Sequence, residues 1–455
     1  MAKPIISVSG LRGVIGESLT PDLAVRYVAA FAASLPADTS GKKAGPVIVS
    51  RDGRTTGGML AAAVHSALAA SGLDVWDAGI AATPTLGVLV RHYAAAGGVQ
   101  ISASHNPSPY NGLKLFNHEG RVIPAAAGQK VLEGYRQGRY AWAAHDQIGT
   151  IRPLPDSTGP HLKLLLETVD APAIQARSCK VLLDSNAGAG SLLGKALLQQ
   201  LGCQVTLLGG DPTGLFLHPP EPTAENLRSV QEEVLAAGAD IGFCQDPDAD
   251  RLAVIDEQGR YIGEEYTVAL CLDHVLRQRN GSVVTNCSTS RMSQDLAAKY
   301  GAAFSRSAVG EANVVDEMKR VGAIFGGEGN GGPIDPRIGY VRDSFVGMAL
   351  ILAAMTSCQK KISELVAELP RYHIHKTTTP LGAERLPAAL NALQKHFAEA
   401  KPDRLDGLRL DWPDRWLIIR GSNTEPIVRI IAEAPDAAAA AKLCAAASAV
   451  LKSCN

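Results

Sequence analysis

The chain has 455 residues, with 44 basic and 45 acidic side chains and a formal net charge of −1. This balance excludes the long-range attraction to nucleic acid or anionic lipid that strongly basic proteins have, so any anion site must be local. The length predicts about three or four domains. The eight cysteines are scattered, without a Cys-x-x-Cys pair. This pattern argues against a zinc cluster or a disulfide framework and favours a reducing compartment.

The first elements along the chain alternate between strand, loop and helix. An apolar run at 46–50 precedes Arg51-Asp-Gly-Arg54, and a helical pattern follows at 59–70. The same alternation returns at 180–201 and at 281–300. It predicts mainly parallel sheets with helices on their faces, in which ligands bind the loops that leave the carboxyl ends of the strands.

One such loop follows the apolar segment at 98–101. It reads Ser-Ala-Ser-His-Asn-Pro at 102–107 and places Ser104 among turn residues, which predicts a displayed serine. A serine is a poor nucleophile unless a base, a cation or a metal activates it, and His105 and Lys114 are candidates. An ordinary turn with capping side chains is the alternative.

An acidic loop lies farther along, after a Pro- and Gly-containing stretch at 147–159 that predicts a linker. Asp246, Asp248 and Asp250 alternate directly before an apolar run at 252–255. Carboxylates with this spacing can converge on one hard divalent cation, and they repel one another without it. An EF-hand begins in the same way but needs glycine where Arg251 stands, and a solvated turn is the other alternative.

A third loop, Gly-Gly-Glu-Gly-Asn-Gly-Gly at 326–332, has five glycines around Glu328 and Asn330. Glycines let the backbone approach a ligand closely, and these two side chains can bond sugar hydroxyls. A flexible linker is the alternative. The apolar residues at 323–325 and the helical pattern at 344–355 argue against it.

The last part of the chain contains a strand-like segment with His373 and His375 at alternate positions, a pattern more typical of surface residues than of a metal site. A second strand-like segment at 416–419 leads into Arg420-Gly-Ser-Asn-Thr-Glu-Pro-Ile-Val-Arg429. Guanidinium, hydroxyl and free backbone N–H groups together suit a dianion such as phosphate.

Together, these four loops resemble those of the α-D-phosphohexomutase family, which includes phosphoglucomutases, phosphomannomutases and phosphoglucosamine mutases. The resemblance covers nearly the whole chain, with the loops in the family's order. It implies an α/β fold of three related domains with mixed, mainly parallel sheets, plus a smaller C-terminal α+β domain, around a central cleft. The boundaries expected from the sequence are 1–152, 153–256, 257–370 and 371–455, for domains that carry the phosphoserine, metal, sugar and phosphate loops in that order.

The resemblance also implies roles for individual residues. Ser104 would carry the phosphoryl group, and one Mg²⁺ would be bound by a Ser104 phosphate oxygen with Asp246, Asp248 and Asp250. The residues expected to bind substrate are Glu328, Asn330, Arg420, Ser422, Asn423, Thr424 and Arg429. Arg12 and Lys114 match positions proposed for acid and base work, with His105 beside the phosphoserine.

The implied reaction moves a phosphoryl group between the 6- and 1-positions of a hexose phosphate through a bisphosphorylated sugar, with a hexose 1,6-bisphosphate as activator. Many family members have Gly-Glu-x-Ser-Gly-His in the sugar loop, whereas this chain has Asn330 and Gly332 in place of the serine and the histidine. This loop is similar to that of archaeal-type members often assigned to phosphoglucosamine mutation. Conversion of glucosamine 6-phosphate to the 1-phosphate is therefore favoured, with mannose and glucose phosphates as alternatives.

Two other functions are compatible with parts of the pattern: a metal-dependent sugar phosphatase and a non-catalytic sugar-phosphate sensor. A separate phosphate loop favours transfer within one substrate over hydrolysis, and an intact Ser104, aspartate loop and Lys114 argue against a sensor. No signal-like segment is apparent, and the longest apolar stretch, near 345–355, is too short to span a bilayer. We expect a cytoplasmic monomer or homodimer that binds a small hexose phosphate, with no nucleic acid or membrane partner.

Overall fold

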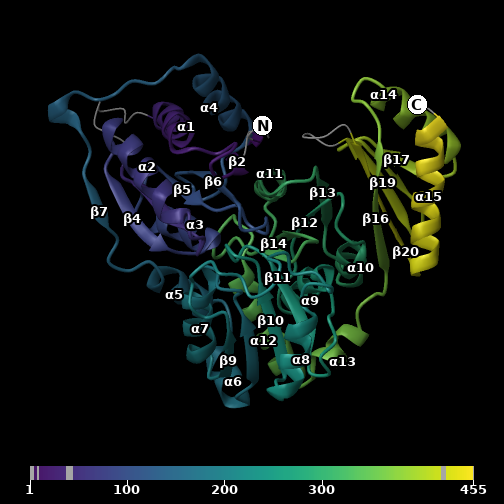
Figure 1. Cartoon of the computed structure of the whole chain (residues 1–455). Helices are drawn as coiled ribbons and strands as arrows, with labels where there is room; N and C mark the ends of the chain where they lie inside the picture. Colours follow the sequence, from purple (N-terminus) through teal and green to yellow (C-terminus); the bar gives the residue numbers. More distant parts are fainter. Residues whose placement is uncertain (1–4, 8–9, 37–44, 422–426, 454–455) are drawn as a thin grey trace.

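In the described part of the chain, four β-sheets follow one another, and the first and last lie on opposite sides of the molecule (Figure 1). The computed structural model describes residues 5–7, 10–36, 45–421 and 427–453. Three sheets mix parallel and antiparallel strands, whereas the C-terminal sheet is antiparallel. The expected fold class, three α/β units with a smaller C-terminal domain, is confirmed.

The first sheet has seven strands in the order β1-β2-β6-β5-β3-β4-β7. The strands are β1 (Ile5–Ser7), β2 (Gly10–Val14), β3 (Val47–Arg51), β4 (Val75–Ile80), β5 (Gly97–Ile101), β6 (Tyr110–Asn117) and β7 (Ile151–Pro153). The helices are α1 (Pro21–Ser34), α2 (Gly57–Ala70), α3 (Thr83–His92), α4 (Ala125–Gln137) and the short 3-10 helix at His145–Gln147. The stretch expected to be a linker was only partly that, because β7 within it pairs in parallel with β4.

The second and third sheets have four strands each, in the orders β11-β10-β8-β9 and β13-β12-β14-β15. The second unit contains β8 (Lys180–Asp184), β9 (Gln204–Leu208), β10 (Ile241–Gln245), β11 (Leu252–Asp256), α5 (Gly159–Glu167), α6 (Ala171–Arg177), α7 (Gly190–Gln200) and α8 (Arg228–Ala236). The third contains β12 (Val283–Asn286), β13 (Phe304–Ser307), β14 (Phe325–Glu328), β15 (Gly332–Ile334), α9 (Glu264–Gln278), α10 (Met292–Lys299), α11 (Glu311–Val321), α12 (Ser344–Cys358) and α13 (Ile362–Ala367).

Helix α12 joins the second and third units through one hydrophobic core. The core includes Phe243 of β10, Phe325 of β14 and Leu352 of α12, each with 0% of its surface exposed. The longest apolar stretch of the sequence is therefore a buried helix, started by Asp343, whose carboxylate accepts the N–H groups of the first turn. Among the described residues, no helix is long and apolar enough to cross a membrane.

The C-terminal sheet has the order β16-β20-β19-β18-β17 and its own core. Its elements are β16 (His373–Pro380), β17 (Lys401–Asp403), β18 (Leu408–Asp411), β19 (Trp416–Gly421), β20 (Ile427–Ala434), α14 (Leu386–His396) and α15 (Ala437–Ser453). His373 and His375 are exposed on β16, as their alternation predicts. A small cluster of Cys287, Trp416 and Ile418 attaches this sheet to the third unit.

Candidate functional site

Ser104 lies in the turn between β5 and β6, but it is buried, with 3% of its surface exposed. The expectation of a displayed serine was wrong, because the acidic loop of the second unit covers it. The Ser104 hydroxyl donates to Asp246 Oδ2 at 2.7 Å. The backbone at Ser104 is left-handed, with φ of 50°, and such non-glycine conformations persist only where the surroundings hold them.

Arg54 provides much of that constraint. Its guanidinium donates to four carbonyl oxygens of the loop: Ser104 at 2.6 Å, Asn106 at 2.6 Å, Pro107 at 2.9 Å and Tyr110 at 3.0 Å. Arg54 Nε also contacts Asp52 Oδ2 at 3.1 Å. Burial raises the pKa of Asp52 to about 6, and Arg54 opposes that rise. The Ser104 loop is therefore built around a buried ion pair.

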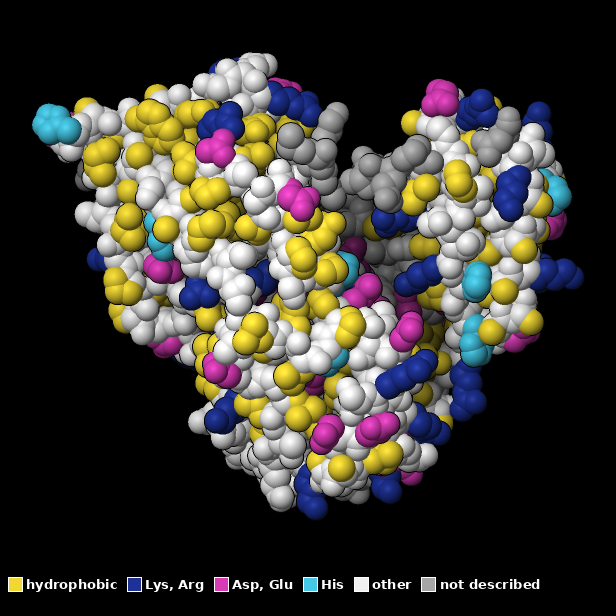
Figure 2. Space-filling model, in the orientation of Figure 1, with side chains coloured by type: hydrophobic (Ala, Val, Ile, Leu, Met, Phe, Trp, Pro, Cys, Tyr) yellow, Lys and Arg dark blue, Asp and Glu magenta, His cyan; other side chains and the backbone are white. Residues whose placement is uncertain are grey.

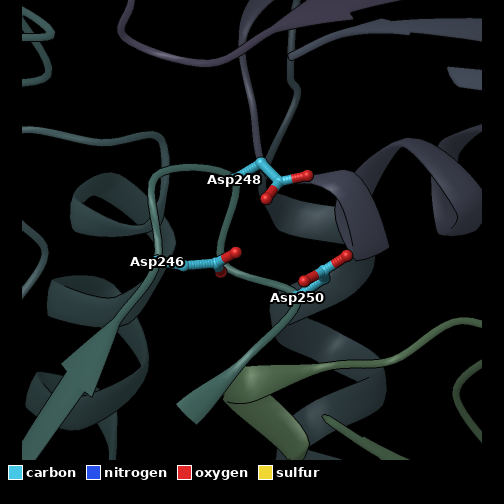
Figure 3. Close-up of side chains that lie close together, drawn as sticks. All are labelled: Asp246, Asp248 and Asp250. Atoms are coloured by element: carbon cyan, nitrogen blue, oxygen red, sulfur yellow. The ribbon is translucent and has the colours of Figure 1, made fainter. Parts of the chain in front are cut away.

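The three aspartates lie in the loop between β10 and β11, and each has 0% of its surface exposed. Figure 3 shows their carboxylates extending from this one loop. One oxygen of each lies within 4.8 Å of the others. Ala249, between the second and third aspartates, has a left-handed backbone with φ of 55°, so this turn is also held in an unusual conformation.

These carboxylates fit a divalent cation. Burial, followed by the charges of Asp250 and Asp248, raises the pKa of Asp246 well above its usual range. Asp248 Oδ1 and Asp250 Oδ1 are buried and have no hydrogen-bond partner within the described part of the chain. Such unsatisfied oxygens are costly, and hard oxygen ligands are what Mg²⁺ prefers. The expected set of aspartates can therefore hold a metal ion.

Lys114 of β6 reaches the aspartate loop from the first sheet. Its Nζ contacts Asp248 Oδ2 at 2.5 Å and Asp250 Oδ2 at 3.0 Å. Burial alone would discharge this amine, but the two carboxylates outweigh burial and raise the pKa of Lys114. In this arrangement Lys114 is a fixed ammonium group beside the carboxylates.

His105 and Arg12 flank Ser104. His105 Nδ1 lies 3.4 Å from Ser104 Oγ. Burial, with the nearby charges of Arg251 and Arg12, lowers the pKa of His105 to about 3, so its imidazole is neutral at neutral pH. Arg12 donates to Asn106 Oδ1 at 2.8 Å, which places its guanidinium against the same turn.

The glycine-rich segment forms a tight antiparallel hairpin of β14 and β15, not a flexible linker. Glu328 ends β14 and has 4% of its surface exposed. Its Oε1 accepts from Asn286 Nδ2 at 2.7 Å and from the Gly310 N–H at 3.1 Å. Asn330 lies in the turn, and its Oδ1 is buried without a partner among the described residues.

Arg420 and Arg429 lie on neighbouring strands, directly opposite each other in the register of β19 and β20. Like charges placed in this way repel, and an anion between them removes that repulsion. Arg420 also pairs with Asp406 at 3.2 Å. Ser422, Asn423 and Thr424, which the sequence assigned to the same phosphate site, lie outside the described residues.

A cleft of about 620 Å³ brings these loops together. Its lining includes one or more residues from each of the four units: His105, Arg251, Glu328, Asn330, Arg420 and Arg429. Figure 2 shows the molecule hollowed between the first and last units, with acidic and basic side chains on the walls. Residues from four parts of the sequence thus face one space, with His105 next to Ser104 and Arg251 next to Asp250.

Comparison with known proteins agrees with this arrangement. Four phosphoglucomutase/phosphomannomutase domain patterns match in succession: alpha/beta/alpha domain I at 4–141, domain II at 160–259, domain III at 264–372 and the C-terminal domain at 379–450. The chain belongs to the phosphoglucomutase/phosphomannomutase family. It is therefore a phosphohexomutase, an enzyme that moves a phosphoryl group within a sugar phosphate, as the four loops predict.

Relatives in this family differ in the sugar their names give. A phosphoglucomutase/phosphomannomutase of Thermococcus kodakarensis is 38% identical over 93% of both chains. A probable phosphoglucosamine mutase of the same organism is 34% identical over 98% of this chain and 97% of its own. A crystal structure of a family protein from Burkholderia thailandensis has a TM-score of 0.85 and 26% identity, over 99% of this chain and 97% of that one.

The sequence analysis missed two arginines of the site. Arg54 stood out only as a basic residue between strand and helix, and Arg342, which contacts Asp250 and Glu328, was not singled out at all. A signal for Arg54 existed in the Asp-Gly-Arg spacing after a strand. Arg342 lies 92 residues from Asp250, and nothing in its local sequence indicates that contact.

Proposed function

We propose that this phosphohexomutase uses Ser104 as its phosphoryl carrier. One observation carries the proposal: the Ser104 hydroxyl lies 2.7 Å from Asp246, in a three-carboxylate loop of another unit. A serine that only stabilises the fold would not need a potential metal site beside its hydroxyl oxygen. Beside magnesium, the same oxygen could bear a phosphoryl group whose charge is balanced.

In the proposed reaction the P–O bond to Ser104 breaks while a new P–O bond forms to a free hydroxyl of the sugar. The sugar hydroxyl loses its proton and the departing Ser104 oxygen takes one up, so the transfer consumes no proton overall; His105, with Nδ1 3.4 Å from Ser104 Oγ, is placed to pass it. The Lys114 ammonium and the Arg12 guanidinium balance charge on the transferring oxygens. Magnesium held by the three aspartates and the serine oxygen would supply further charge neutralisation.

The product of this step is a sugar bisphosphate, which must turn in the cleft before its other phosphate returns to Ser104. Arg420 and Arg429 would grip whichever phosphate is distant from Ser104. We propose that Ser422, Asn423 and Thr424 complete this grip. Because a bisphosphate that escapes leaves an unphosphorylated serine, an added hexose 1,6-bisphosphate should act as the activator.

For the substrate we propose glucosamine 6-phosphate, converted to the 1-phosphate, with mannose and glucose phosphates as the alternatives. Relatives named as probable phosphoglucosamine mutases support this choice. The cleft also offers acidic side chains to an amino group, Glu221, Glu264, Glu265 and Glu328, beside the basic Arg251, Lys376, Arg420 and Arg429. Glu264 Oε1 is buried and lacks a hydrogen-bond partner among the described residues, so it is available to a substrate ammonium group.

The test compares kcat/KM for glucosamine, glucose and mannose 6-phosphates with a bisphosphate activator present. The wild-type enzyme should prefer glucosamine 6-phosphate, and Glu264→Gln should reduce that preference. Glu232→Gln, an exposed residue of α8, is the matched control. Equal efficiencies on all three sugars would instead indicate a broad-specificity enzyme.

A second measurement tests the carrier. Ser104→Ala should abolish turnover and incorporation of phosphate while the protein stays folded. Substantial mutase activity in that variant would contradict the phosphoserine assignment. Stoichiometric release of inorganic phosphate by the wild type would identify a phosphatase instead.

A further inference from the structure

Gly332 and Arg342 compete for one space beside the site. Gly332 begins β15 and is buried. An ideal Cβ at Gly332 would lie 2.5 Å from Arg342 Cδ, 2.8 Å from its Cγ and 2.9 Å from its Cβ. Carbon atoms cannot approach that closely, so the arginine stem occupies the volume that a side chain at 332 would need. Glycine at this position is therefore a requirement of the Arg342 conformation.

The Arg342 guanidinium ends among three carboxylates. It contacts Asp250 Oδ2 at 2.7 Å, Glu311 Oε2 at 2.9 Å and Glu328 Oε2 at 3.0 Å. Each contact uses a different guanidinium nitrogen. The side chain has 12% of its surface exposed, and the three carboxylates outweigh the effect of burial and raise the pKa of Arg342. The group is therefore a permanent cation fixed in three directions.

These three carboxylates come from different parts of the molecule. Asp250 belongs to the aspartate loop, Glu328 ends β14 beside the cleft, and Glu311 begins α11. Glu328 has its other oxygen taken by Asn286 and the Gly310 N–H. Arg342 holds the remaining oxygen, Glu328 Oε2, and the same guanidinium contacts Asp250 of the aspartate loop.

We propose that Arg342 is a positioning residue that sets the distance and orientation between the sugar-binding carboxylate Glu328 and the aspartate loop. The proposal rests on the function proposed above. It also assigns a purpose to Gly332, where the commonest family pattern has histidine: in this chain the cation beside Glu328 comes from Arg342 instead. A lysine could not do the same, because its compact ammonium lacks the planar fork that spreads three contacts over three nitrogens.

The first experiment compares Arg342→Met and Arg342→Lys with Arg320→Met, a control at an exposed arginine of α11. Binding of glucosamine 6-phosphate to the metal-free protein, measured by calorimetry, should weaken at least 10-fold in both Arg342 variants. Binding of Mn²⁺ alone should be unchanged or tighter, because a cation that competes for Asp250 has been removed. The control should match the wild type in both.

These two affinities separate positioning from a general structural role. Loss of sugar-phosphate and Mn²⁺ binding together, with a lower melting temperature, would mean that Arg342 only supports the fold. Unchanged sugar-phosphate binding in Arg342→Met would overturn the proposal. Neither readout requires turnover, so a failure of the proposed function, seen as activity retained by Ser104→Ala, is distinguishable from a failure of this inference.

The second experiment exchanges the two side chains. Gly332→His alone should displace Arg342 and lower both the melting temperature and sugar-phosphate affinity. Gly332→His combined with Arg342→Ala removes the clashing Cγ and Cδ atoms and restores a nitrogen donor near Glu328, so it should recover part of both losses. If the double variant is no better than the worse single variant, the two side chains do not share one space and the inference is wrong.

Discussion

Replacing Arg54, in the loop between β3 and α2, by methionine should severely damage the Ser104 loop. The variant leaves Asp52 buried without its ion-pair partner and removes the donors to four loop carbonyls. Side-chain exposures of 2% and 0% for the pair mean that water cannot replace the lost contact. Breaking a buried pair by removing one partner costs about 3–5 kcal/mol, and we expect a loss of stability of that order.

The catalytic effect should be as large as the structural one. Arg54 holds the backbone of Ser104 itself through a 2.6 Å hydrogen bond. A displacement of the nucleophile by about 1 Å can lower the rate roughly 100-fold. Arg54→Met should therefore lower kcat by about two orders of magnitude without an equal change in the affinity for sugar phosphate, since the proposed sugar and phosphate loops lie in the third and fourth units.

The assay combines calorimetric unfolding with hydrogen exchange of residues 102–112, with Arg51→Met as the control. Arg51 belongs to the same Arg-Asp-Gly-Arg segment, but its guanidinium donates to the Asp52 carbonyl at 3.5 Å, outside the Ser104 loop.

The defect should also depend on pH. The pKa of Asp52 is about 6 in the fold because of burial, and loss of Arg54 raises it further. A raised carboxyl pKa stabilises the fold at low pH and loses that contribution as pH increases, so the gap from wild type should widen between pH 5 and pH 8. Equal stability and exchange in the Arg54 and Arg51 variants would refute this reasoning.

Three further outcomes are expected. Chelation of divalent metal should stop turnover, with recovery on adding Mg²⁺; metal-independent turnover would contradict the role given to the aspartates. Arg420→Ala should raise KM by roughly 100-fold, as expected for loss of a charge-assisted phosphate contact, while Ser104 still accepts phosphate from a bisphosphate sugar. Glu265→Gln should raise the melting temperature at pH 8.5 but not at pH 5. Burial raises the pKa of Glu265 to about 8, so the wild-type fold loses stability as pH rises from the ordinary glutamate pKa to that value. A melting-temperature difference independent of pH would contradict this assignment.

Several features of the site could be predicted because their causes are local. Alternation of carboxylates in the aspartate loop places three side chains around one turn, and their oxygens do lie within 4.8 Å of one another. Repetition of strand, loop and helix likewise predicts the class of fold, since each element depends on the residues within it. The order of the four loops was enough to recognise the family, which the domain matches confirm.

Other features depend on how distant segments pack. The composition of its own turn suggested that Ser104 is displayed, but Asp246, 142 residues away, buries it. The stretch at 147–159, which was expected to be a linker, contributes β7 because the edge of β4 is available to pair with it. Burial and strand pairing of this kind depend on a segment that is distant in the sequence, and the local sequence does not indicate which segment that is.

The sequence by itself determined which chemical groups this protein brings to its candidate site: a serine, three aspartates, a glycine-rich turn with a carboxylate, and paired arginines. Only the tertiary structure decided which of them touch, and it added Arg54 and Arg342 as the residues that fix the Ser104 loop and Glu328. The physical reason is the distance along the chain over which each kind of contact acts. Spacing along a turn sets contacts over a few residues, whereas a buried charge is placed by whichever opposite charge the packed domains bring within reach.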